Sequence, residues 1–180
     1  MTDAAGTLTS KVRGNTHLAS VWAQDTWVFA SKWKAVLGLR AENWKASDGS
    51  TFFSSTSTLN YADRKENFIS PKDAVSFQLA PDTVLKTSVG RAICFATVAE
   101  LYGATSTTNS QFINDPNLRP EKSWTGALSA EKDNGAGVLR ATLFAENTRD
   151  SLYSQTILDP VANKNISRVR NIGCIETRGV

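Results

Sequence analysis

The feature that most constrains this chain is a regular alternation of apolar and polar residues between positions 33 and 44. Leu37 and Leu39 occupy one set of alternate positions, whereas Arg40 and Glu42 occupy the other. Since successive side chains of a β-strand point to opposite faces, this period predicts a strand with one apolar and one polar surface. The chain must therefore form a sheet whose two faces meet different surroundings.

Similar alternation predicts further strands at residues 16–29, 74–80, 84–93, 123–131, 138–153 and 167–180. Short links join them into hairpins at residues 30–32, 81–82 and 133–135, and the last link contains Asn-Gly, a strong hairpin signal. The 18 serines, 19 threonines and 12 asparagines also favour strands and turns over helices. We therefore predict an all-β chain, an antiparallel up-and-down meander of about seven strands.

The connections between these hairpins are much longer than the hairpin turns. Residues 45–66 and 96–120 are predicted as polar loops, and two such loops would be unusual in a compact soluble domain. A transmembrane β-barrel, in contrast, alternates short turns with long external loops, and its strands carry no long apolar run. Within the second loop, Thr97 and Glu100 match a capping box, which predicts one helical turn unless the match is fortuitous.

Composition argues against several classes of function. The formal net charge of +3 is spread along the chain, so we expect no nucleic-acid partner. Cys94, Cys174 and His17 are too few for a four-ligand zinc site, and His17 has no nucleophilic partner in a recognisable motif. We therefore expect no catalytic, cofactor-binding or metal-binding residues, and no enzyme activity.

Charged residues at the polar positions of the predicted strands are the candidate functional residues. In a barrel they would face the lumen and could contact a ligand or a lumen-filling plug; alternatively, they form a solvated, salt-bridged wall. These lumen-facing candidates are Arg40, Glu42, Lys86, Glu131, Arg140 and Glu146. The five tryptophans lie near predicted strand ends, as in the aromatic girdle of a barrel, or are core residues of a soluble sandwich: Trp22, Trp27, Trp33, Trp44 and Trp124.

Several phrases resemble the barrel domain of TonB-dependent outer-membrane receptors. Residues 84–92 read VLKTSVGRA and residues 97–103 read TVAELYG, as in the middle of that barrel. Residues 114–123, NDPNLRPEKS, resemble the phrase that opens a strand after a long external loop. Further similar phrases lie at residues 22–25, 143–155 and 175–180, so that the resemblance runs in family order from residue 22 to residue 180.

The resemblance implies a protein of the outer membrane of a Gram-negative bacterium that imports ferric siderophores or similar ligands. Its barrel has 22 strands, its partners include outer-membrane lipid, and its N-terminal plug domain transmits energy from the TonB complex. Because about seven strands and no plug are recognisable, we expect residues 1–180 to form a partial barrel domain. Alone, such a fragment should be an open curved sheet.

Two positions depart from the family pattern. Cys94 lies in Ile-Cys-Phe-Ala, where the family usually has Phe-Arg-Phe-Pro, and Cys174 stands where an arginine is common. The cysteines are interpreted either as a disulfide or redox pair or as unrelated substitutions in a decaying gene. For the chain as a whole, the alternative to a receptor fragment is a soluble antiparallel β-sandwich or barrel that acts as a binding module.

Overall fold

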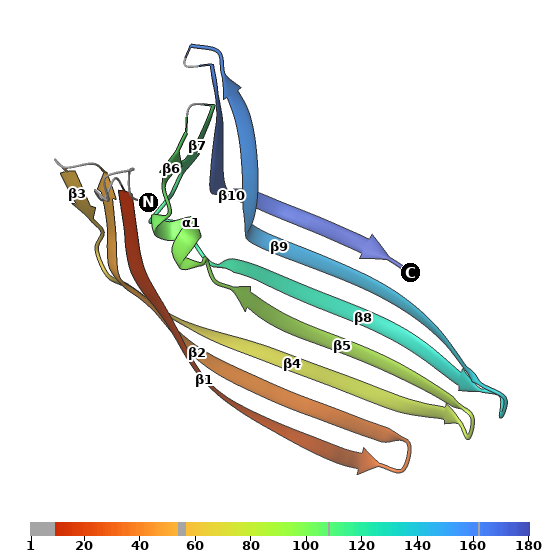
Figure 1. Cartoon of the computed structure of the whole chain (residues 1–180). Helices are drawn as coiled ribbons and strands as arrows, with labels where there is room; N and C mark the ends of the chain where they lie inside the picture. The colour runs from red at the N-terminus through yellow and green to blue at the C-terminus, as the bar shows by residue number, and fades with distance from the viewer. Residues whose placement is uncertain (1–9, 54–56, 108, 162) are drawn as a thin grey trace.

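The fold is one curled, mainly antiparallel sheet, given by a computed structural model that describes residues 10–53, 57–107, 109–161 and 163–180 (Figure 1). Seven long strands follow one another across it in the order β1-β2-β4-β5-β8-β9-β10. Their bounds are β1 Ser10–Ala30, β2 Trp33–Phe53, β4 Arg64–Ala80, β5 Thr83–Cys94, β8 Glu121–Asp133, β9 Val138–Asp159 and β10 Lys164–Gly179. The predicted all-β meander is confirmed.

The three predicted hairpins are also confirmed, and their turns lie at one end of the sheet (Figure 1). Residues 31–32, 81–82 and 134–137 link the paired strands. In the last turn, Gly135 adopts a positive φ of 79°. The Asn134 side-chain oxygen there accepts backbone hydrogen bonds from Ala136 at 3.1 Å and from Gly137 at 2.9 Å. The turn residues read from the sequence therefore fix the register of this hairpin.

The prediction of a loop at residues 45–66 is wrong. β2 continues to Phe53, and β3 (Ser57–Asn60) pairs with it before β4 begins at Arg64. The register between β1 and β2 shifts by one residue next to Asp48, which has a φ of 56°. Such a bulge exchanges the two faces of the strand, so the alternation that marks residues 33–44 does not continue through it.

The long connection at residues 95–120 is partly ordered by a short helix, α1 (Val98–Tyr102). As the capping box predicts, the Thr97 hydroxyl accepts a hydrogen bond from the Glu100 backbone N–H, and the Glu100 carboxylate accepts one from the Thr97 N–H at 2.7 Å. β6 (Thr105–Ser106) and β7 (Ser110–Ile113) follow, and β7 pairs in parallel with β10. No helix in the described ranges is long and apolar enough to cross a membrane.

The hydrophobic core lies where α1 packs inside the curve of the sheet, at the end opposite the hairpin turns (Figure 1). Its buried members are Trp44, Ala46, Ala96, Leu101, Tyr102, Leu118 and Val169. The Tyr102 ring lies against Gly14 of β1 and Gly49 of β2, where an added Cβ would approach it closer than 3.0 Å. Two glycines thus provide the space into which the helix docks.

The tryptophans divide between the two faces of the sheet. Trp27 and Trp33 lie on the apolar face near the hairpin turns, and Phe29 lies between them with ring centroids 5.2 Å and 6.0 Å away. The expected position at a strand end is wrong for Trp22 and Trp44, which lie in the middle of β1 and of β2 and face the polar side of the sheet. Trp44 is only 2% exposed because α1 and its loop cover it.

We predict that Gly49→Ala displaces α1, because the new methyl group would overlap the Tyr102 ring, at a cost of about 1–3 kcal/mol to the free energy of docking. The measurement is hydrogen exchange at the Leu101 amide, which bonds to the Thr97 carbonyl at 3.0 Å, in the chain refolded in detergent micelles. Gly137→Ala is the control, since no heavy atom lies within 4 Å of its Cβ position. Unchanged exchange in Gly49→Ala would contradict the packing described.

Candidate functional site on the polar face

The register of the sheet places all six predicted polar-face residues on one face. Arg40 and Glu42 lie two residues apart on β2, and cross-strand pairing connects their positions through β4 to Lys86 of β5. Pairing across β8 and β9 continues the same face to Glu131, Arg140 and Glu146. We call this surface the polar face, and the opposite surface, which carries Leu37 and Leu39, the apolar face.

Three of the predicted residues form one ion-pair network near the hairpin turns. The Glu131 carboxylate lies 2.7 Å from the Lys86 Nζ and 2.8 Å from the Arg140 Nε. The three side chains come from neighbouring strands, β5, β8 and β9, so they form a band across the sheet. One carboxylate therefore compensates two cations here.

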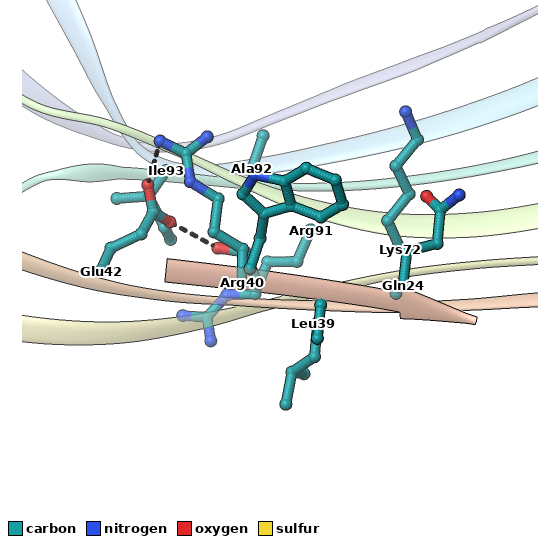
Figure 2. Close-up of a pocket in the computed structure, with 12 residues that line it drawn as sticks. Gln24, Leu39, Arg40, Glu42, Lys72, Arg91, Ala92 and Ile93 are labelled. Carbon is teal, nitrogen blue, oxygen red and sulfur yellow. Dashed lines mark hydrogen bonds and ion pairs between the residues drawn. The ribbon is translucent and has the colours of Figure 1, made fainter. Parts of the chain in front are cut away.

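A second network joins β2 and β4. One oxygen of the Glu42 carboxylate lies 3.2 Å from the Arg40 guanidinium, and the other accepts a hydrogen bond from the Ser70 hydroxyl at 2.8 Å (Figure 2). The Glu42 side chain is only 4% exposed, so these contacts offset the cost of removing its charge from water.

Glu146 is the sixth candidate, and it makes no contact with the other five. Its Oε1 accepts hydrogen bonds from the Ser123 hydroxyl at 2.6 Å and from the Thr148 hydroxyl at 3.2 Å. Each candidate carboxylate therefore has partners within the wall itself. The six candidates thus lie on one surface. Five of them form two separate ion-pair networks, and among the described residues Glu146 is bonded only to hydroxyl groups.

The polar face also has a hollow of about 270 Å³ that sequence reasoning did not identify. Arg40 and Glu42 line it, together with Trp22 and Gln24 of β1 and Lys72 of β4 (Figure 2). The prediction missed Lys72 because it began this strand at residue 74, after Pro71 and Asp73, two residue types that strands disfavour.

Next to the core, Arg64 fixes the segment with the sequence NDPNLRPEKS to the sheet. Its guanidinium donates hydrogen bonds of 2.8 Å to the carbonyl groups of Pro116 and Leu118, and it stacks 5.5 Å from the centroid of the Trp44 ring. Burial raises the pKa of the Tyr102 phenol on nearby α1 above its ordinary value, because the charged form would lose its contact with water. This end of the polar face is therefore covered by an ordered segment.

The two cysteines do not form a disulfide, so that interpretation is wrong. Cys94 of β5 and Cys174 of β10 are separated by β8 and β9 and occupy positions on opposite faces. Two such thiols cannot approach to bonding distance without rearrangement of the sheet. No group of three or more metal-ligating side chains of His, Cys, Asp or Glu occurs in the described part of the chain.

Comparison with known proteins gives a match over nearly the whole chain. A family model described as TonB dependent receptor-like, beta-barrel matches residues 2–180. A search among curated proteins gives no match.

Solved structures of transport proteins share the fold. The hemophore receptor HasR of Serratia marcescens, solved with its hemophore HasA and heme, has a TM-score of 0.74 and 16% identity over 92% of this chain and 31% of its own. The copper transporter OprC has a TM-score of 0.69 and 16% identity over 92% of this chain and 25% of its own. The siderophore receptor PirA from Pseudomonas aeruginosa has a TM-score of 0.58 and 13% identity over 93% of this chain and 39% of its own. The chain thus spans well under half the length of each.

Proposed function

Because the chain belongs to the TonB-dependent receptor-like β-barrel family, whose members are receptors and transporters of the bacterial outer membrane, we propose that it forms part of a receptor wall that imports ferric siderophores or similar ligands. The observation that carries this proposal is the division of one sheet into an ion-paired polar face and an exposed apolar face. The assignment is to transport and not to catalysis.

In this proposal the apolar face meets membrane lipid. Large apolar side chains remain exposed there on β1, β2, β4, β8 and β9, including Val21, Leu37, Leu39, Ile69, Leu128 and Leu143. No second sheet covers this face within the described residues, as a soluble sandwich would require. Lipid would cover such a surface without loss of hydrogen bonds, because its backbone groups are paired between strands.

The polar face then lines the lumen. We propose that residues 1–180 are a partial barrel domain, that a plug domain fills the lumen, and that the TonB complex acts through the plug. The ion-paired candidates Arg40, Glu42, Lys86, Glu131, Arg140 and Glu146 are the wall that this plug or a passing ligand would meet. Since most of these charges already have partners within the wall, the surface can stay polar without binding tightly to whatever passes.

We predict that Leu39→Arg destabilises the complete barrel by about 2–4 kcal/mol, the cost of arginine on a lipid-facing strand near the midplane. Leu39 is flanked by Ala23 and Pro71, whereas Leu37 is flanked by Asp25 and Asp73, whose carboxylates would compensate an arginine. Urea unfolding of the barrel in lipid vesicles gives the free energy. Thr142→Arg, on the polar face of β9, is the control for an added cation, and an equal cost in both variants would reverse the assignment of the faces.

The hairpin turns and the loop end should lie on opposite sides of the membrane, with the loop end outside. In a background with both cysteines replaced by serine, Asn163→Cys should react with a membrane-impermeant maleimide on intact cells carrying the complete receptor. Ala136→Cys, in the exposed turn between β8 and β9, should react only after lysis. The reverse pattern would mean that the topology is inverted.

Import itself is tested by uptake of radioactive iron as a ferric siderophore into a receptor-deficient strain. We expect the complete receptor to restore uptake and the 180-residue chain alone not to, because β1 pairs only with β2 along the described sheet, and unpaired backbone groups in lipid cost several kcal/mol each. Restoration by the chain alone would refute the need for further strands. Absence of uptake by the complete receptor, when it is present at the cell surface, would refute siderophore import.

A further inference from the structure

Lys72 lies in a row of the polar face where its neighbours on both sides are glycines. It pairs with Gly38 of β2 and with Gly90 of β5, and Gly38 pairs in turn with Gln24 of β1. Since glycine has no side chain, nothing on the flanking strands of this row shields the lysine. The hollow of about 270 Å³ opens at this place, and Figure 2 shows Lys72 and Gln24 pointing to the same side of the sheet.

The charge of this lysine is not compensated within the wall. The polar face carries the basic residues Lys34, Arg40, Lys72, Lys86 and Arg140, and the carboxylates that form ion pairs with members of this set are those of Glu42 and Glu131. Glu42 pairs with Arg40, while Glu131 pairs with both Lys86 and Arg140. Lys72 has no ion-pair partner among the described residues, whose nine salt bridges involve other cations.

We propose that this hollow is a binding site for a small carboxylate-bearing ligand, with Lys72 as its anchoring cation. The Lys72 ammonium offers three hydrogen-bond donors and the Gln24 amide offers two more, whereas Trp22, which also lines the hollow, offers an apolar ring. A carboxylate would give Lys72 the counter-charge that no described side chain supplies, and an apolar ligand stem would lie against the indole. The inference rests on the proposed function only in its assignment of this face to the lumen.

Succinate is the probe, and its neutral diamide, succinamide, is the control that has nearly the same shape without charge. In the full chain refolded in detergent micelles, succinate should change the fluorescence of Trp22, which is 71% exposed, in a saturable manner at constant ionic strength. Trp22→Phe identifies the signal because it should remove it. Succinamide should produce no saturable change.

Substitutions then locate the site. Lys72→Gln should weaken succinate binding about tenfold or more, the effect expected when a charged hydrogen-bond donor is lost, whereas Lys72→Arg should retain most of it. Lys34→Gln is the matched control, since Lys34, on β2, also lies on the polar face but does not line the hollow. Circular dichroism reports whether each variant keeps its strand content. If Lys72→Gln does not fold, Lys72→Arg still tests the site, because the proposal requires that this folded variant retain most of the succinate binding.

Equal weakening by Lys34→Gln and Lys72→Gln would reduce the effect to general attraction by a basic surface and overturn the proposal. Equal responses to succinate and succinamide, or no response in the folded chain, would overturn it as well. These outcomes are separate from failure of the proposed function, because a complete receptor could import ferric siderophores without this site. Conversely, loss of import with intact succinate binding would refute only the transport assignment.

Discussion

Antiparallel pairing of seven long strands is the constraint on which the rest of the structure depends. Each backbone hydrogen bond between strands fixes a register, and each register decides which side chains share a face. A slip of one residue in β2 would carry Leu37 and Leu39 to the polar face and Arg40 to the apolar face. The two faces are so different in polarity that any slip by an odd number of residues would mix the charges with the large apolar side chains.

The polar face achieves most of its charge balance internally. Glu131 lies between Lys86 and Arg140, and Glu42 is buried beside Arg40 of its own strand and Ser70 of β4, so contacts within the wall hold the carboxylates that a lumen would otherwise have to solvate. Such partly exposed pairs contribute little stability individually. Their effect is on surface character, because they leave a polar wall in which few cations, Lys72 and Lys34 among them, have no ion-pair partner in the described part of the chain.

The hydrophobic core of the described residues lies at the loop end, where the long connection returns onto the polar face. Tyr102 of α1 fills the space left by Gly14 and Gly49, and Arg64 holds the carbonyl groups of the segment that follows. The bulge at Asp48 places Gly49 on the face that meets the helix. The short helix, the bulge and the two glycines therefore form one packing unit, although they are far apart in the sequence.

The sequence by itself determined the strands whose two faces differ in polarity, the hairpin turns and the capping box, because each depends on residues close together in the chain. Period-two alternation separated Leu37 from Arg40, and Asn134-Gly135 marked a turn, without knowledge of any partner. Only the tertiary structure decided what depends on register between strands. It showed that β2 continues beyond the bulge at Asp48, that Trp44 is buried beneath α1, and that Lys72 lies alone between Gly38 and Gly90. These features have no local signal, since a side chain's neighbours across a sheet come from other strands.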